Sequence, residues 1–383
     1  MGSRCESVDV VVIGSSPLLL LEALHQSRLG HRVVVVESAH LVGGAWREMP
    51  LFGLRRVEIA PHIVMYNRVT YDYFAQDLKL NVQKMSPSPR YVWNSPLGRL
   101  WIPYALSPFI AYVSAPLHYI RNKQYRANFA LIREEYFGRL GHATKLLLLW
   151  IFAGRKPSIE YPLRGTLDLV DRIEELLKAT NVQVRLKTAV LSVEKTSENG
   201  IQVGCSDGVT LKAKRVIMTR HQYVPRLAVA GKPVDSLYNF NTYTSVHLLV
   251  KTAHPSRSAF VLAKRDPLIN LFSDLTSYMD DVPPGRRVLT LRLPHGHQAN
   301  DRATAERVVE HLRASTYLAS DAELVDFNFS VYEQGRIRPE GLAAVEAAFG
   351  DSLMIFRSTN FSNSIGDRVT EWKRSAQTFA RTE

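Results

Sequence analysis

Cysteine is scarce in this chain of 383 residues, which contains only Cys5 and Cys205. Two cysteines without a C-x-x-C spacing exclude a disulfide framework and any multi-cysteine metal site, and they predict a reducing, cytoplasmic compartment. The chain also lacks an apolar segment before Val8 of the kind that forms a secretory signal, so we predict no signal peptide.

The motifs of common hydrolases are missing as well. Neither G-x-S-x-G nor H-E-x-x-H occurs in the sequence, so a serine-hydrolase elbow and a zinc-protease helix are not predicted. The pair His295 and His297 follows a predicted strand without a carboxylate at close spacing. We therefore predict a loop there and no metal site.

Charge is unbalanced, with 48 Lys and Arg against 36 Asp and Glu, a formal net charge of +12. The basic residues are scattered and form no block interleaved with aromatic residues, so nucleic-acid binding is not predicted. An anionic small-molecule substrate or an anionic membrane surface explains the positive charge instead.

A long hydrophobic run of the kind that spans a bilayer is also missing. The segment Trp101–Ile120 has no charged residue, but Pro103, Pro108 and Pro116 interrupt it and would break the backbone bonding of a spanning helix. We predict that this segment lines a substrate cavity, and peripheral membrane contact is the alternative. Lys145–Phe152 is too short to span and is predicted to be a buried or interfacial helix end.

The N-terminal segment has the pattern of a dinucleotide-binding βαβ unit. An apolar run, Val8–Ile13, precedes a tight turn at Gly14, and a second run, Val33–Val36, ends in Glu37. The acid stands at the distance where such units bind a ribose hydroxyl. The unit predicts a nucleotide cofactor extended along its first strand and helix.

The glycine fingerprint of this unit is eroded. In the usual G-x-G-x-x-G the glycines form the turn, admit a pyrophosphate and pack helix on strand. Here the three positions hold Gly14, Ser16 and Leu19. Ser15 and Ser16 lie in the turn, where Ser16 can still offer an N–H and a hydroxyl to phosphate. The bulk of Leu19 is expected to move the helix away from the strand and weaken cofactor binding.

The segments that follow Glu37 resemble flavin-binding proteins of the amine oxidase and UDP-galactopyranose mutase group. Leu41 to Trp46 reads LVGGAW, and residues 60 to 67 read APHIVMYN, which is similar to a Gly-Pro-His-Ile-Phe-His-Thr-Asn segment of the mutases. A hairpin predicted at Arg90–Trp93 and Arg99–Tyr104, and a Tyr-Pro-x-x-Gly step ending at Gly165, add to the resemblance. It covers most of the chain.

The resemblance implies FAD as the cofactor, together with a set of site residues. Gly43 and Gly44, followed by Ala45, would let the chain pass close to the flavin's phosphate and ribityl chain. Trp46 would stack over the flavin ring or the substrate, and its alternative is a core residue. Pro61 and His62 would lie beside the isoalloxazine. His62 is the implied catalytic residue, which tunes the ring or carries a proton; its alternative is a satisfied structural histidine. The other implied flavin contacts are Val190 near the adenine ring, and Gly366 and Asp367 at the start of the last helix.

The expected fold class is α/β, a split Rossmann-like FAD domain with an α+β substrate domain that carries an antiparallel sheet and a helical insertion. The first domain comprises residues 1–89, 160–225 and 335–383, and the second residues 90–159 and 226–334. Predicted strands of the first domain lie at Val182–Leu186, Ala189–Lys195, Ile201–Cys205, Thr210–Ala213, Arg215–Thr219 and Ser352–Phe356, beside a helix at Leu167–Ala179. The second domain is predicted to contain strands at Thr244–Val250, Ala259–Ala263, Leu268–Leu271, Arg287–Leu293 and Phe327–Tyr332, and a helix at Ala303–Ala314.

Two functions follow from this sequence. The first is an FAD-dependent oxidoreductase that oxidises or isomerises a small hydrophobic or anionic metabolite by hydride transfer at flavin N5. The second, motivated by Ser16 and Leu19, is a flavoprotein-derived scaffold that binds FAD weakly or no longer. Such a scaffold would carry out a non-redox rearrangement or dehydration, or would bind another enzyme.

Overall fold

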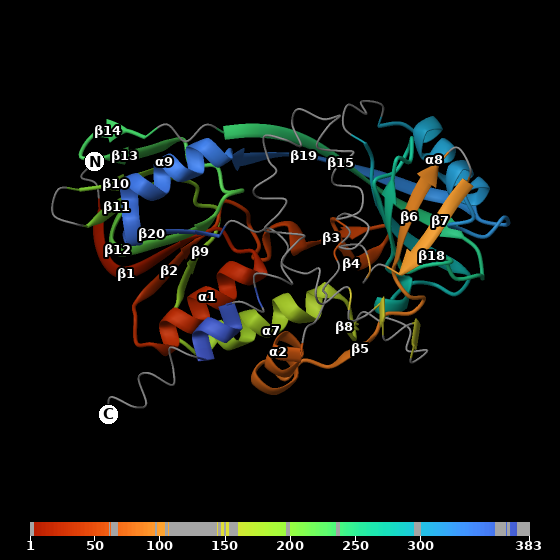
Figure 1. Cartoon of the computed structure of the whole chain (residues 1–383), viewed down its shortest axis with the longest axis horizontal. Helices are drawn as coiled ribbons and strands as arrows, with labels where there is room; N and C mark the ends of the chain where they lie inside the picture. Colours follow the sequence, from red (N-terminus) through yellow and green to blue (C-terminus); the bar gives the residue numbers. More distant parts are fainter. Residues whose placement is uncertain are drawn as a thin grey trace.

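Two β-sheets and the long antiparallel ribbon between them organise the chain (Figure 1). The computed structural model describes residues 4–60, 62, 68–95, 98–103, 106, 144, 147–148, 151–152, 160–196, 200–234, 238–294, 300–356, 365 and 368–373. The first sheet has nine strands and the second has seven. We call the two parts of the molecule built on these sheets the nucleotide lobe and the sheet lobe.

The nucleotide lobe contains the predicted βαβ unit. β1 (Cys5–Ile13) is followed by α1 (Pro17–Arg28) and β2 (Val33–Val36), and β1 pairs in parallel with β2 and with β12 (Thr210–Thr219). All four residues of β2 are buried. A parallel strand covered on both faces needs an unbroken apolar run, which explains why the sequence alone located these strands.

The nine-stranded sheet forks at β12. The first half of β12 pairs with β11 (Ile201–Cys205), and its second half pairs with β20 (Leu353–Phe356). The prediction of two strands at 210–213 and 215–219 was wrong, because one continuous strand serves both neighbours. The remaining strands of this sheet are β9 (Gln183–Arg185), β10 (Val190–Lys195), β13 (Arg226–Val229) and β14 (Lys232–Pro233).

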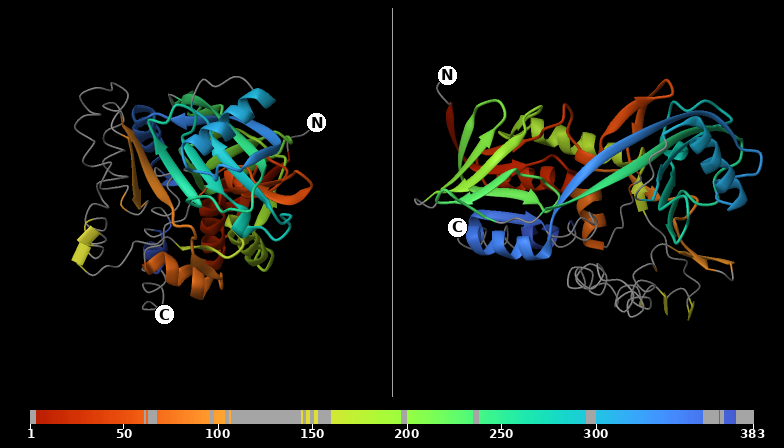
Figure 2. Two further views of the ribbon diagram at one scale, coloured as in Figure 1. Left: turned by 90° about the vertical axis from the view of Figure 1, so that its right-hand side faces the viewer. Right: turned by 90° about the horizontal axis from the view of Figure 1, so that it is seen from above.

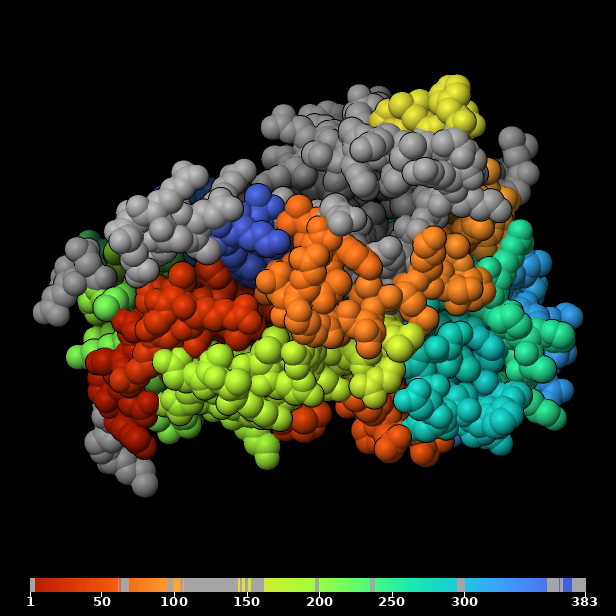
Figure 3. All heavy atoms as spheres, turned by 90° about the horizontal axis from the view of Figure 1, so that it is seen from below, coloured from red at the N-terminus to blue at the C-terminus, as the bar shows by residue number. Residues whose placement is uncertain are grey.

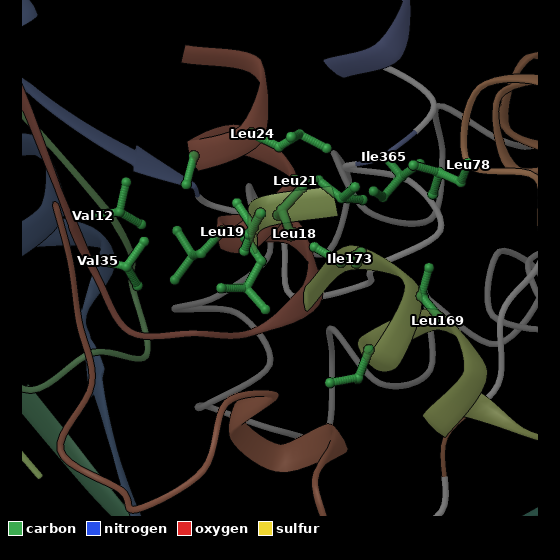
Figure 4. Close-up of a cluster of buried hydrophobic side chains, with 14 of the residues drawn as sticks. Val12, Leu18, Leu19, Leu21, Leu24, Val35, Leu78, Leu169, Ile173 and Ile365 are labelled. Carbon is green, nitrogen blue, oxygen red and sulfur yellow. The ribbon is translucent and has the colours of Figure 1, made fainter. Parts of the chain in front are cut away.

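Helices cover both faces of this sheet. α1 and α7 (Thr166–Lys178), with the helical residues 368–373, pack in one apolar cluster on one face. α9 (Pro339–Phe349), which was not predicted, packs on the other face through Leu342, Val345 and Phe349. Figure 4 shows the first cluster, in which Leu19 lies in the interface between α1 and strand residues such as Val12 and Val35.

The sheet lobe is antiparallel except between β16 and β6, in the order β19-β15-β18-β17-β16-β6-β7. One face of its sheet packs against α8 (Arg302–Ala314). The third predicted strand is displaced: β17 begins at Leu271, since Asp266 accepts the N–H groups of Leu268 and Ile269 and turns the chain there. The bounds of the strands are β15 (Tyr238–Lys251), β16 (Phe260–Lys264), β17 (Leu271–Asp274), β18 (Arg286–Arg292), β19 (Glu323–Ile337), β6 (Arg90–Ser95) and β7 (Gly98–Pro103).

β15 and β19 form the ribbon that connects the lobes, seen in full from above in Figure 2. Their pairing runs from Tyr238 opposite Ile337 to Lys251 opposite Glu323. Ile337 is buried in the core of the nucleotide lobe and Tyr238 packs against it. The predicted domain limits stay a prediction, but the sheet pairing differs from them in one place: β13 and β14, beyond residue 225, belong to the nucleotide lobe.

The chain also contains shorter elements, most of which lie between the two lobes, while η6 follows α9 in the nucleotide lobe. These are β3 (Glu48–Leu51), β4 (Leu54–Glu58), α2 (Arg68–Asp72), the π-helix η2 (Tyr73–Asp77), β5 (Val82–Lys84) and β8 (Glu160–Pro162), with short 3-10 turns η1 (Gly44–Trp46), η5 (Thr276–Tyr278) and η6 (Gly350–Ser352). β7 ends at Pro103 and Leu106 is buried, and the rest of Trp101–Ile120 lies outside the described residues. In the described part of the chain, no helix is long and apolar enough to cross a membrane.

Candidate dinucleotide and substrate site

The turn after β1 holds Ser15 against Glu37. The N–H and the hydroxyl of Ser15 both donate to Oε2 of Glu37, at 2.9 and 2.6 Å. The N–H of Ala39 donates to Oε1 at 2.8 Å and the Ser38 hydroxyl lies 3.3 Å from the same oxygen. A carboxylate has about four acceptor sites, so groups of the protein already engage all of those of Glu37.

Gly43 and Gly44 pack directly on this turn. Gly43 has φ of 106°, and its N–H donates to the Ser15 carbonyl oxygen at 2.9 Å. A Cβ on Gly44 would lie 3.5 Å from the backbone of Ser16, and φ there is 57°. Both positions favour glycine because L-residues with a side chain rarely adopt positive φ. The double glycine and the fingerprint turn therefore lie against each other, backbone to backbone.

The N-terminus of α1 lies beside the same turn. Ser16 is the N-cap and makes no side-chain capping bond, and Pro17 occupies the first turn. The first-turn N–H groups of a helix have no intrahelical acceptor and attract anions. These residues fit the phosphates of a dinucleotide: a tight glycine turn, a glycine pair and a free helix N-terminus meet there.

Two features depart from an open dinucleotide site: Gln222 covers the glycine turn, and a leucine replaces the third glycine of the fingerprint. Gly14 has φ of 93°, and a Cβ there would lie 2.2 Å from Nε2 of Gln222, so the Gln222 amide covers the turn. Leu19 is fully buried in the helix–sheet cluster. It therefore acts as a core residue where the fingerprint has its third glycine.

A second group of residues surrounds His62. The ring of His62 stacks on Trp46 at 4.5 Å between centroids, with an interplanar angle of 26°. Its Nδ1 lies 4.0 Å from Oε2 of Glu58. Burial, followed by the positive charge of Arg292, lowers the pKa of His62 to about 3. His62 is thus a neutral imidazole near pH 7.

Glu58 fixes this group to the start of α7. Its Oε1 accepts the N–H of Thr166 at 3.0 Å and also the Thr166 hydroxyl. A carboxylate at a helix N-terminus is stabilised by the free N–H groups and the helix dipole. Gly165, with φ of 83°, lets Glu58 approach, since a Cβ there would lie 3.2 Å from Oε1.

The sheet lobe turns a polar face toward this group. The register places Tyr243, Ser245 and His247 of β15 on the face opposite to the α8-packed residues Val246 and Leu248. Their cross-strand partners on β19 and β18 are also polar: Tyr332, Ser330, Arg292 and Thr290. The Thr290 hydroxyl lies 3.4 Å from the Glu58 carbonyl oxygen, which joins this face to β4.

Arg292 is the charged residue of this polar face. It donates to the Tyr332 hydroxyl at 2.6 Å, and its guanidinium lies 4.8 Å from the centroid of the Tyr243 ring. The two tyrosine rings stack at 5.4 Å. Its Nε is buried without a hydrogen-bond partner among the described residues.

The predicted site residues divide into three groups. Gly14, Ser15, Ser16, Glu37, Gly43 and Gly44 come together at the fingerprint turn, and Trp46 and His62 form the stacked pair. Ala45 is exposed, and Val190 is buried two residues after Thr188, whose N–H donates to the Glu37 carbonyl. Pro61, Gly366, Asp367 and the His295-Gly296-His297 segment lie outside the described residues.

The described residues of the last helix pack against α1. Arg368 donates to Oε2 of the buried Glu22 at 3.0 and 2.7 Å, and the Trp372 indole donates to the same oxygen at 3.1 Å. Ile365 is fully buried in the α1 cluster. Ile365, Arg368 and Trp372 are therefore held against α1 of the nucleotide lobe.

Sequence reasoning missed Arg292, Tyr243, Tyr332 and Glu58. An alternation of polar and apolar residues along β15 and β18 was visible in the sequence, but only the strand register places these side chains together. Among the described residues, no group of His, Cys, Asp and Glu could hold a metal ion.

Comparison with known proteins gives the relationships of the chain. Solved structures that match it include putrescine oxidase bound to putrescine (15% identity, TM-score 0.63, covering 99% of this chain and 100% of that one) and a putative protoporphyrinogen oxidase from Exiguobacterium sp. 255-15 (13%, 0.62, 100% of both). Reduced UDP-galactopyranose mutase matches at 13% identity and a TM-score of 0.61, over 97% of this chain and 94% of that one.

At these identities the likeness shows the fold, which confirms the predicted α/β class with a Rossmann-like sheet and an antiparallel sheet. The search of curated proteins finds no match. The flavin-containing amine oxidoreductase family matches residues 105–333, more than half of the chain. The chain is therefore a member of the flavin-containing amine oxidoreductase family, whose members bind FAD.

Proposed function

We propose that the chain binds FAD and is an oxidoreductase or flavin-dependent isomerase that acts on a small anionic or amphipathic metabolite. Gly14, Ser16, Gly43 and Gly44 would hold the dinucleotide at the free N-terminus of α1. When bound, FAD supplies the hydride acceptor or donor, at its N5 atom. The residues of the chain bind and orient the substrate and exclude water.

The proposal of an anionic substrate rests on one observation, a hydrogen-bond donor of Arg292 that no described residue satisfies. Its Nε is buried and has no hydrogen-bond partner in the described part of the chain, although its neighbours Tyr332 and Tyr243 fix the guanidinium. The contacts of the guanidinium within the described residues are with these two tyrosines, and none is with a carboxylate. A buried donor without an acceptor is costly, and a carboxylate or phosphate of a substrate would satisfy it.

His62 contributes as a neutral ring. With a pKa of about 3 it does not act as an imidazolium acid near pH 7. Stacked on Trp46 and close to Glu58, it can donate or accept one hydrogen bond in a dry site. We propose that His62 orients the substrate or cofactor through this hydrogen bond and passes a proton between neutral groups.

The first test is the absorption spectrum of freshly purified protein, followed by identification of any released cofactor. A flavin spectrum with released FAD supports the proposal. Arg292→Gln should then leave FAD content unchanged and weaken turnover or binding of anionic substrates, whereas Arg292→Lys should retain part of it. A variant that loses FAD as well would place Arg292 in the cofactor site rather than the substrate site.

A second candidate, the scaffold without FAD, rests on Glu37. Because Ser15, Ser38 and Ala39 engage all its acceptor sites, a ribose hydroxyl has to displace one of them. The Gln222 amide also covers Gly14. A colourless protein that takes up no added FAD, even as Ser15→Ala, would favour this candidate; uptake that appears in Ser15→Ala would show that Ser15 closes an existing FAD site.

A further inference from the structure

We infer that one exposed apolar face of the sheet lobe docks on an anionic membrane surface. This docking face consists of Leu100, Leu148, Ile151 and Phe152, bordered by Lys264 and Arg265. It shares no residue with the dinucleotide turn or with the polar face around Arg292, and it does not depend on the proposed cofactor.

The β6–β7 hairpin provides the base of the docking face. In its register Tyr91 lies opposite Ile102 and Trp93 opposite Leu100, so these four side chains share one side of the hairpin. Tyr91 and Ile102 are buried, Trp93 is half-buried and Leu100 is 60% exposed. The apolar side thus continues from the core out to solvent.

The helical residues Leu147, Leu148, Ile151 and Phe152 form a short segment beside this hairpin. Leu147 packs in the cluster of Tyr91 and Ile102, while the other three residues face solvent. Leu148 is 48%, Ile151 62% and Phe152 82% exposed. Positions separated by four residues share one side of a helix. Leu148 and Phe152 therefore form one outward side, while Ile151 lies on the side of Leu147 but is itself exposed.

The segment lies at the outer edge of the molecule, where it is the yellow element in the left view of Figure 2 and the yellow spheres of Figure 3. A large aromatic side chain with only a fifth of its surface covered is unusual for a residue whose sole role is packing. Its position at the periphery lets a flat surface reach it.

The basic residues around the docking face indicate that the membrane surface it binds is anionic. The two strands of the hairpin carry Arg90 and Arg99 and contain no Asp or Glu. Lys264 pairs across from Trp93 and is exposed, and the Arg265 guanidinium lies 5.4 Å from the Trp93 ring. Apolar residues bordered by basic ones, with an indole at the boundary, match an anionic lipid surface.

The test is co-sedimentation of the full-length protein with vesicles. We expect binding to vesicles of phosphatidylcholine and phosphatidylglycerol in equal parts, weak binding to phosphatidylcholine alone, and weaker binding at high salt. Ile151→Asp with Phe152→Asp should weaken binding at least about tenfold, because two apolar side chains no longer enter the interface. Lys264→Gln with Arg265→Gln should weaken it several-fold.

Matched controls use exposed residues elsewhere. Leu191→Asp and Val331→Asp alter aliphatic residues that are 49% and 54% exposed, and Lys212→Gln with Lys232→Gln removes two exposed charges from the nucleotide lobe; all should bind as the unchanged protein does. The inference is overturned if the protein ignores anionic vesicles or if the controls lose as much binding. It is equally overturned if Ile151→Asp with Phe152→Asp instead abolishes a concentration-dependent dimer, since a second copy would then cover this face.

Discussion

The two sheets of this protein are built on opposite plans. In the nucleotide lobe, β1 and β2 are parallel and their residues enter apolar clusters on both faces. In the sheet lobe, β15 and β18 are antiparallel, with one apolar face under α8 and one polar face toward Glu58. The nine-stranded sheet is thus stabilised by burial of both its faces, whereas the seven-stranded sheet buries one face and presents polar side chains on the other. Under the proposed function, the nucleotide lobe would hold the cofactor and the polar face of the sheet lobe would hold the substrate.

A buried carboxylate lies among the apolar core residues of the nucleotide lobe. Glu22 of α1 has a fully buried side chain and is held by Arg368, Gln26 and Trp372. Arg368→Ala would leave that carboxylate without its positive partner, and we expect a loss of about 3–5 kcal/mol in the free energy of unfolding. Chemical denaturation measures it. Arg302→Ala, which removes an exposed helix pair with Glu306, is the control and should change little; equal losses would contradict a special role for Glu22.

Truncation of one core leucine in each lobe compares the two plans directly. Leu19 and Leu289 are both fully buried, one on α1 and one on β18. Leu19→Ala and Leu289→Ala should each cost about 2–5 kcal/mol. Each variant should still unfold in a single transition, because the β15–β19 ribbon ends in the core of the nucleotide lobe. Two separated transitions would show that the lobes fold independently.

The burial of Leu19 also changes what restoring the fingerprint would do. Leu19→Gly removes a core side chain and places glycine inside a helix, so it should destabilise the fold whatever it does for FAD. Ser16→Gly alone, at the N-cap, tests the phosphate site without this cost.

The polar plan should make stability depend on pH. His247 is fully buried between the hydroxyls of Thr290 and Ser330, and burial lowers its pKa to about 4. The unfolded chain therefore binds a proton between about pH 6.5 and that value while the folded chain does not. Stability is full above about pH 6.5 and falls as the pH is lowered, by about 2 kcal/mol from this residue at pH 5.

The variant His247→Gln should reduce that slope in urea titrations carried out at several pH values. A slope of smaller size will persist, because His62 and His221 also have lowered pKa values caused by burial. An unchanged slope would mean that His247 is already protonated or solvated in the folded protein.

The smallest expected effect is on the electrostatic interaction between Arg292 of the sheet lobe and His62. Arg292→Gln should raise the pKa of His62 from about 3, since the charge of Arg292 contributes to lowering it. The pKa should stay below its ordinary value because burial is the larger cause. Nuclear magnetic resonance titration of the ring measures this, with Arg292→Lys as the control that keeps the charge. No change would mean that the polar face does not reach His62.

The sequence located the parallel strands and the hairpin because each has a local signature. Val33–Val36 is an unbroken run of β-branched residues, and the hairpin of β6 and β7 has turn residues between two apolar segments. The bounds failed where contacts distant in sequence decide them. β12 is one strand because β11 and β20 pair with different halves of it, and α9 is defined by its packing on the nucleotide lobe.

By itself the sequence determined the βαβ frame, the glycine pair and the family resemblance, since spacing along one short segment fixes each of them. Only the tertiary structure decided that Ser15 engages Glu37, that Gln222 covers Gly14 and that Arg292 lies near His62. These residues are 22 or more positions apart in the chain. Hydrogen bonds and charge interactions act over a few ångströms, so distances in the folded molecule, not in the sequence, decide which of them form.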